Sequence, residues 1–189
     1  TQNGVLESGE VDYTTTYCST YEIWQVDDIN SGGSSVPGQN MEILVGDTIY
    51  FDAGTGSSGY DRELWAHDTS NSSTWQVTDI NSGTGSHYPG FYMAILVGDT
   101  IYFDAGNGSS GTHELWAHDT SNSSTWLAAD LNNSLWVGSE VGESMAVLVG
   151  DTLYFSANDG SSGRELWAHD TSNSSTWQVA DINNISGGS

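Results

Sequence analysis

The chain has 189 residues, of which 36% are hydrophobic and eight are tryptophan, so it is long enough to bury a core of its own. Its charge is one-sided, because 25 acidic side chains face only Arg62 and Arg164, which gives a formal net charge of -23. This charge excludes nucleic acid and anionic membranes as partners, and the lack of lysine excludes chemistry through a Schiff base or a P-loop lysine.

Cysteine content and hydropathy narrow the possibilities further. Cys18 is the single cysteine, so an internal disulfide and a cysteine-based zinc site are excluded. No apolar run approaches the roughly 18 residues that would span a bilayer, so we expect no membrane insertion. Because a large excess of carboxylates repels itself in dilute buffer and is screened by salt, we expect a salty or divalent-rich setting.

In chain order, an N-terminal segment at 1–30 comes first and holds a strand-like stretch at 21–29. Trp24 opens the motif Trp-x-x-x-Asp-(Ile/Leu)-Asn, which returns every 51 residues at Trp75, Trp126 and Trp177. A second landmark, Gly-Asp-Thr-(Ile/Leu)-Tyr-Phe, recurs every 52 residues at Gly46, Gly98 and Gly150. The chain is therefore one continuous array of repeats, which we place at 41–81, 92–132 and 144–183.

Each repeat has the signals of four short strands. In the first repeat, strands at 43–45 and 48–53 flank the two-residue hairpin turn Gly46-Asp47. A Gly/Ser-rich loop at 54–59 leads to a strand at 63–67, and the polar turn at 68–73 returns the chain as a strand at 74–80. Four antiparallel strands in about 40 to 50 residues are typical of a β-propeller blade, so we predict an all-β, propeller-like fold.

Apolar side chains stand on both faces of the predicted sheet, with Ile49 and Phe51 opposite Tyr50. Each aromatic side chain buries about 150 to 250 Å², which favours stacking of neighbouring blades over isolated sheets. We therefore predict that Leu64, Trp65 and Trp75, with their counterparts in the other repeats, are packing residues.

The stretch from Leu153 to Thr171, LYFSANDGSSGRELWAHDT, resembles the ELWxxDGT repeat of predicted secreted proteins from marine microbes. The resemblance covers roughly Trp24 to Asn183, although this chain has Asp-Thr-Ser where the family motif has Asp-Gly-Thr. It implies a propeller-like protein that lies outside the cell or at its surface. The family brings no catalytic residues to this chain.

The strand count leaves one strand over. There are three complete sets of the first three strands but four copies of the last, the additional one being the stretch at 21–29. Because propeller rings typically contain about 4 to 8 blades, three are too few to close one. Two alternatives follow: the chain joins copies of itself head to tail in a ring or filament, or it is a piece of a longer single-chain propeller.

The sameness of the repeats argues against an enzyme, because catalysis needs unlike groups at one place. The side chains that depart from the repeat contain no recognisable catalytic motif; they are Arg62, His87, Tyr88, His113, Trp136, Glu140, Glu143 and Arg164. Histidines recur at His67, His118 and His169, where a hydrogen-bonded ring between blades competes with a zinc or proton-transfer role. If the protein instead binds carbohydrate, we expect Trp136, Tyr88 and His87 to contact it.

Oxygen-rich turns suggest calcium as a possible cofactor. The candidate ligands are Asn158 and Asp159 in one turn and Asp68 and Asn71 in another. Neither turn matches the full ligand ladder of a calcium-binding loop, and turns in which Asn or Asp accepts local backbone hydrogen bonds account for the same residues.

Six asparagines begin sequons for N-glycosylation. Asn71, Asn122 and Asn173 open Asn-Ser-Ser in the polar turn of each repeat, whereas Asn107, Asn132 and Asn184 lie in other loops. From these observations together we predict a non-enzymatic, extracellular structural repeat protein that assembles with copies of itself, and we keep a carbohydrate-binding propeller module as the alternative.

Overall fold

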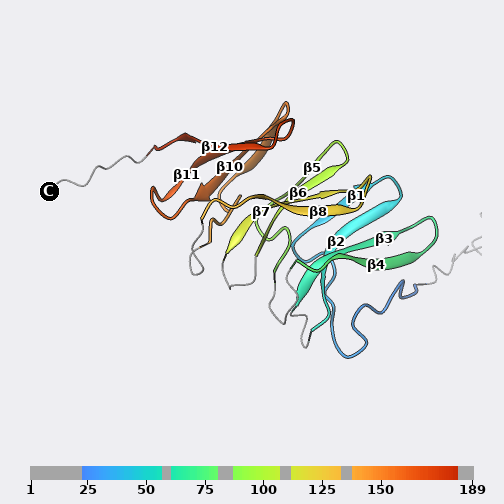
Figure 1. Ribbon diagram of the computed structural model, residues 1–189. Helices are drawn as coiled ribbons and strands as arrows, with labels where there is room; N and C mark the ends of the chain where they lie inside the picture. The colour runs from blue at the N-terminus through green and yellow to red at the C-terminus, as the bar shows by residue number, and fades with distance from the viewer. Residues whose placement is uncertain (1–22, 57–60, 81–86, 107–111, 133–137, 183–189) are drawn as a thin grey trace, which may run out of the picture.

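The computed structural model describes residues 23–56, 61–80, 87–106, 112–132 and 138–182. These residues form three antiparallel sheets of four strands each, with neighbouring strands in sequence order (Figure 1). The predicted all-β fold of four-stranded units is confirmed. Within the described ranges, no helix is long and apolar enough to cross a bilayer.

Each sheet falls inside one sequence repeat. The first sheet contains β1 (Glu42–Val45), β2 (Thr48–Gly54), β3 (Arg62–Asp68) and β4 (Ser73–Thr78). The second sheet contains β5 (Ala94–Val97), β6 (Thr100–Gly106), β7 (His113–Asp119) and β8 (Ser124–Ala129). The third sheet contains β9 (Ala146–Val149), β10 (Thr152–Asn158), β11 (Arg164–Asp170) and β12 (Ser175–Ala180).

The turn between the first two strands of each sheet is the predicted two-residue hairpin. Val45 pairs with Thr48 across it, and Gly46 has a φ of 60° while the following Asp47 stays at negative φ. Positive φ at the first turn residue alone is the pattern of a type II′ turn, which prefers glycine at that position.

The last strand of each sheet is shorter than the predicted 74–80. The pairing of β3 with β4 shifts between Leu64 and Trp65, and β4 ends at Thr78. Beyond that point the backbone N–H of Ile80 donates to the side chain of Glu63 at 3.0 Å, so it is not free to extend the β3 ladder.

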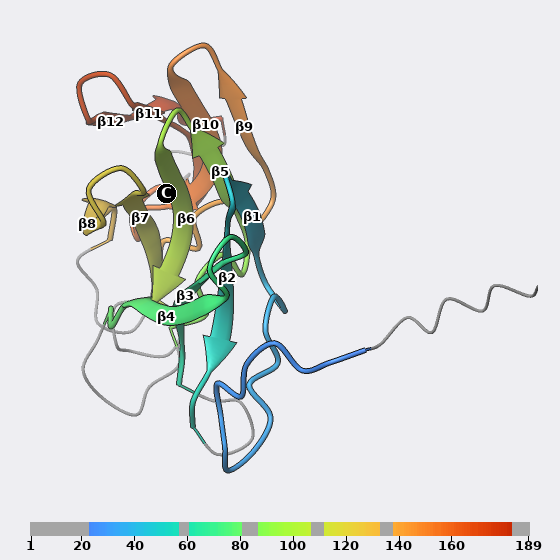
Figure 2. The same ribbon diagram turned by 90° about the vertical axis from the view of Figure 1, so that its right-hand side faces the viewer.

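The three sheets stack face to face, which buries the apolar residues on both faces of the second sheet. Side by side in Figure 2, β1, β5 and β9 lie along one side of the molecule and β4, β8 and β12 along the other. Tyr50, Leu64 and Ala66 of the first sheet pack against Ile101 and Phe103 of the second. The second core repeats this arrangement with Tyr102, Leu115, Ala117, Leu153 and Phe155.

Two predictions need correction. Residues 23–29, the described part of the additional strand predicted at 21–29, form no strand, and Ile23 and Trp24 are exposed. In the three sheets this strand pairs with a preceding one, and no described strand precedes residue 23. Leu64 is fully buried as predicted and Trp65 is half-buried, but Trp75 is 40% exposed on β4, an edge strand with no described strand beyond it.

Candidate functional site at the joints between sheets

Two interfaces, here called joints, connect the first sheet to the second and the second sheet to the third. Both joints contain the same pair of rings. In the first joint the rings of Tyr50 and His118 lie with their centroids 5.5 Å apart, and in the second Tyr102 and His169 lie 5.4 Å apart. The tyrosine comes from the second strand of one sheet and the histidine from the third strand of the next. The ELWAHD histidine of one repeat thus packs under the YF tyrosine of the repeat before it.

Each of these histidines is also fixed within its own sheet. The Nδ1 atoms of His118 and His169 form hydrogen bonds with the hydroxyl oxygens of Thr125 and Thr176, at 2.9 and 2.8 Å. Burial lowers the pKa of both histidines below the usual value, so they are neutral at pH 7. This is the hydrogen-bonded histidine between blades that was one of the two interpretations of the sequence.

A methionine just ahead of each of the first two sheets fills a space left by a glycine of the next repeat. A Cβ atom added at Gly90 would lie 2.5 Å from Cβ of Met41, and one added at Gly142 would lie 2.7 Å from Cγ of Met93. Both glycines also have positive φ, at 71° and 85°. Glycine is therefore required twice over at these positions, by backbone conformation and by space.

The glutamate of the ELW motif ties the end of each sheet to the chain that follows it. The backbone N–H 17 residues later donates to its carboxylate, from Ile80 to Glu63 and from Leu131 to Glu114, each at 3.0 Å. Ile182 donates to Glu165 in the same way at 2.7 Å. The repetition of ELW was visible in the sequence, but the capture of a backbone group by its glutamate was not predicted.

The second partner of this glutamate differs between joints. Nε2 of the fully buried His87 lies 3.6 Å from Glu63, whereas the hydroxyl of Ser139 donates to Glu114 at 2.7 Å. Burial raises the pKa of Glu63 to about 8 and also raises that of Glu114 above its usual range. His87 is enclosed here, which argues against the predicted contact with carbohydrate.

A second acidic position anchors the loop that enters each sheet. In the first repeat Asp52 accepts hydrogen bonds from the backbone of Asn40 and Met41, at 2.9 and 3.2 Å, and from Nε of Arg62 at 2.6 Å. In the second repeat Asp104 takes this place, with Nδ1 of His113 at 2.7 Å instead of an arginine. Burial raises the pKa of Asp104 above its usual range.

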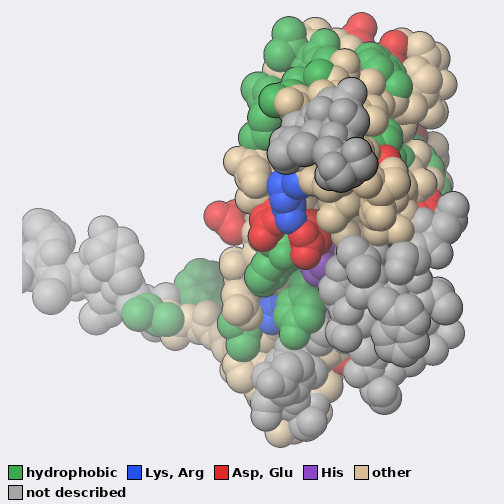
Figure 3. All heavy atoms as spheres, turned by 90° about the vertical axis from the view of Figure 1, so that its left-hand side faces the viewer, with side chains coloured by type: hydrophobic (Ala, Val, Ile, Leu, Met, Phe, Trp, Pro, Cys, Tyr) green, Lys and Arg blue, Asp and Glu red, His purple; other side chains and the backbone are tan. Residues whose placement is uncertain are grey.

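In the third repeat a serine replaces this aspartate. The hydroxyl of Ser156 accepts from the backbone of Ser144 at 2.9 Å. Arg164 therefore lacks the carboxylate that binds Arg62 and pairs instead with Glu140 and Glu143. Figure 3 shows, on one face of the molecule, a basic side chain with acidic side chains around it. Where the third repeat departs from the first, at Ser156, a serine hydroxyl anchors the entering loop and Arg164 binds other carboxylates.

An aromatic group lies beside this acidic pair. The ring of Phe91, which is 51% exposed, lies 5.9 Å from that of Tyr88 and 4.8 Å from that of Tyr92, centroid to centroid. Desolvation, and after it the negative charges of Glu143 and Glu140, raise the pKa of Tyr92. Of the three predicted ligand contacts, Tyr88 belongs to this group and Trp136 lies outside the described residues.

The predicted calcium turns are occupied by their own hydrogen bonds. Asp68 accepts from the hydroxyl of Ser70 at 2.6 Å and from the amide of Asn71 at 2.7 Å, and the Ser70 hydroxyl is the main cause of its lowered pKa. Asp159 accepts from the backbone of Ser162 at 2.8 Å, which with neighbouring bonds lowers its pKa to about 2. Asn158 accepts from Gly160 at 2.9 Å. No group of three His, Cys, Asp or Glu residues arranged for a metal ion is found in the described residues.

The sequon turns are alike in all three repeats. Asn71, Asn122 and Asn173 are exposed, and each accepts a hydrogen bond at 2.9 Å from the backbone two residues later. Asn132, in contrast, is 7% exposed, and its amide lies next to Gly160 of the third repeat. This burial argues against a sugar on Asn132. Asn107 and Asn184 lie outside the described residues.

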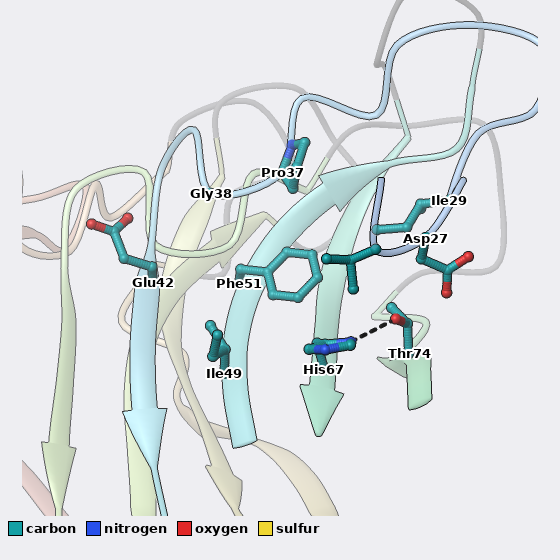
Figure 4. Close-up of a pocket in the computed structure, with 10 residues that line it drawn as sticks. Asp27, Ile29, Pro37, Gly38, Glu42, Ile49, Phe51, His67 and Thr74 are labelled. Atoms are coloured by element: carbon teal, nitrogen blue, oxygen red, sulfur yellow. Dashed lines mark hydrogen bonds between the residues drawn. The ribbon is translucent and has the colours of Figure 1, made fainter. Parts of the chain in front are cut away.

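The outer face of the first sheet holds a cleft of about 410 Å³ (Figure 4). Ile49, Phe51 and His67 form its floor, and Val26 and Ile29 of the N-terminal segment stand at its rim. The lining combines apolar side chains with the polar side chains of Asp27, Glu42, His67 and Thr74. No prediction from the sequence placed a cleft here, because it depends on which sheet face is left uncovered.

Comparisons with known proteins give a fold and no family. No protein-family model matches the chain, and no curated protein matches it. A crystal structure of puromycin hydrolase is similar with a TM-score of 0.50 and 13% identity, over 74% of this chain and 20% of that one. A crystal structure of TolB from Acinetobacter baumannii has a TM-score of 0.46 and 13% identity, over 79% of this chain and 33% of that one.

The likeness to puromycin hydrolase, at this low identity, shows the fold alone. Together with the stacked four-stranded sheets it confirms a propeller-like fold. This chain spans only a fifth of the length of that hydrolase and a third of TolB.

Proposed function

We propose that the protein is a non-enzymatic structural repeat protein that acts outside the cell or at its surface and assembles with copies of itself. The observation that supports this proposal best is that the buried polar side chains bind other parts of the same chain. Glu63 and Asp52 hold backbone groups in place, and His118 is fixed at a joint. Groups that an enzyme would direct toward a substrate hold the backbone in place here or pack one sheet on the next.

Self-assembly has a specific electrostatic condition. With a formal charge of -23, copies repel each other in dilute buffer, and at about 0.5 M salt the Debye length falls to roughly 4 Å. We expect sedimentation velocity and electron microscopy to show rings or filaments at high salt and smaller species in dilute buffer. A chain that stays monomeric in both, with and without calcium, would contradict the proposal. Calcium binding at the turns of Asp68 and Asp159 stays a prediction. Measuring assembly with and without calcium tests it.

Carbohydrate binding is the second candidate, and the exposed ring of Phe91 favours it. Aromatic faces stack on sugars, and the carboxylates of Glu140 and Glu143 nearby accept hydrogen bonds from hydroxyl groups. If this candidate is right, a glycan array will show binding that Phe91→Ala abolishes and that Leu127→Ala, at an exposed apolar position on β8, leaves unchanged.

A further inference from the structure

We propose that copies join head to tail by docking the outer face of the third sheet onto the outer face of the first sheet of a second copy. This inference rests on the proposed function, because it names the surfaces that self-assembly uses. The contact would repeat the two joints already present inside the chain. The residues at equivalent positions on the two outer faces support it.

The outer face of the third sheet presents the residues that the inner joints bury. Val147 and Val149 on β9 are 45% and 60% exposed, whereas Ile95 and Val97, 52 residues earlier, pack against the core between the second and third sheets. Hydrophobic side chains gather over the upper part of Figure 3, where the third sheet lies. Exposed apolar residues that lie together on one sheet face mark a surface for association.

The outer face of the first sheet is the receiving side. Leu44 is 64% exposed, whereas Leu96 and Leu148 at the equivalent positions pack in the two joints. Phe51 faces the cleft and is 8% exposed, and its counterpart Phe103 is fully buried under the first sheet. The cleft is thus the space that the tyrosine strand of a preceding sheet fills in the inner joints.

Two specific contacts follow from the inner joints. His67 on the first sheet has no tyrosine above it in the described structure, and Tyr154 on the third sheet has no histidine below it, although both belong to the recurring pair. Likewise Met145 is 42% exposed, and a Cβ built at Gly38, which has a φ of 68°, meets no methionine side chain within 4 Å. We infer that Tyr154 packs on His67 and Met145 on Gly38 of the next copy.

Docking requires the segment at 26–29 to give way. Val26 and Ile29 line the cleft in the place that Val77 and Ile80 hold at the first inner joint, and an arriving copy brings Val179 of β12 to the same place. The segment forms no strand, and Val26 is 60% exposed. We expect an arriving copy to displace it.

One residue of the receiving face departs from the inner joints. Glu42 stands where the second and third sheets have Ala94 and Ala146, both packed in the cores. Burying a carboxylate opposes docking. We therefore expect Glu42→Ala to strengthen association, by threefold or more in the dissociation constant.

The test measures self-association of the full chain in about 0.5 M salt by sedimentation velocity. Tyr154→Asp and Met145→Asp are each expected to weaken association at least tenfold. Leu127→Asp is the matched control, because it places the same charge at an exposed apolar position away from both faces and is expected to change nothing. Circular dichroism of every variant verifies that the sheets are formed.

Crosslinking tests the predicted pair directly. In a Cys18→Ser background, copies with Tyr154→Cys and copies with His67→Cys are mixed and treated with a bis-maleimide of about 10 Å reach, the usual spacing of packed sheets. Crosslinked dimers are expected in the mixture but not from either copy alone. If the chain assembles, but the Tyr154→Asp and Met145→Asp variants associate as strongly as the wild type and no crosslinked dimer forms, this interface is wrong while self-assembly stands. If the unmodified chain never associates, both proposals fail.

Discussion

At the scale of single residues, the repeated letters divide into those that pack and those that hold the backbone. Leu64 packs in the core, and Glu63 accepts a hydrogen bond from the chain that leaves the sheet. Both roles recur in each repeat because the chain that leaves each sheet offers its glutamate the same backbone N–H, 17 residues later. The variable positions, such as His87 against Ser139, then adjust how each glutamate is satisfied.

Glu63 gives the fold a dependence on pH. Because burial raises its pKa to about 8, the folded chain keeps this proton between about pH 4.5 and 8, where the unfolded chain has lost it. The stability from this group is complete below about pH 4.5 and is lost as the pH rises toward 8. We expect the free energy of unfolding of the wild type to fall about 2 to 4 kcal/mol more than that of Glu63→Gln between pH 5 and 8. Urea denaturation at both pH values measures this difference. An equal change in the free energy of unfolding for the wild type and Glu63→Gln would contradict the prediction.

Gly90 tests the packing of methionine against glycine. Gly90→Ala forces a Cβ against Met41 and also strains a residue at positive φ, which together cost about 2 to 4 kcal/mol. Gly98→Ala is the control, since Gly98 has a φ of 59° and nothing within 4 Å of a built Cβ. Its expected cost is about 1 to 2 kcal/mol, from the backbone alone. Equal losses for the two variants in urea denaturation would show that Met41 moves aside freely.

The sequons give a prediction about modification. When the chain is secreted from a host with the glycosylation machinery, we expect glycans on Asn71, Asn122 and Asn173, whose turns are exposed. We expect none on Asn132, which is buried. Peptide mass spectrometry after release of the sugars in heavy water locates each occupied site. A glycan on Asn132 would mean that the third sheet is not yet packed when the sugar is added.

At the scale of the elements, strands stabilise the molecule through their faces more than through their edges. The three sheets share one pattern of strand pairing, yet among the described residues only the second sheet has both faces covered by other sheets. The tryptophans of β4, β8 and β12 lie on edge strands and are partly exposed. Equivalent side chains in the three sheets therefore differ in energy even though their sequences agree.

This difference is measurable at one recurring phenylalanine. Phe103→Ala removes a fully buried ring from the first joint, and we expect it to cost about 3 to 5 kcal/mol. Phe51→Ala, on the open cleft, is expected to cost at least about 1 kcal/mol less, because water enters the space that the ring leaves. Denaturation at low protein concentration keeps self-association out of the comparison. Equal costs would mean that the cleft is closed in solution.

At the scale of the whole molecule, the sheets form a stack with two unlike ends. One end presents the tyrosine face of the third sheet, and the other presents the histidine face of the first. Unlike ends that match each other generate head-to-tail assemblies, which close into rings or grow into filaments according to the rotation at each contact. The proposed extracellular assembly depends on this property.

The sequence by itself determined the number of sheets, the order of their strands and the stacking of their faces. Short apolar runs, glycine turns and a repeat of 51 to 52 residues are local signals, and they need no knowledge of distant contacts. Only the tertiary structure decided that His87 and Asn132 are buried, that Trp75 is exposed, and that Glu63 holds a backbone group. These outcomes depend on which residues of the next repeat lie opposite. The letters of a repeat are the same whether or not a neighbouring sheet covers it, so the sequence alone does not show which copies are buried.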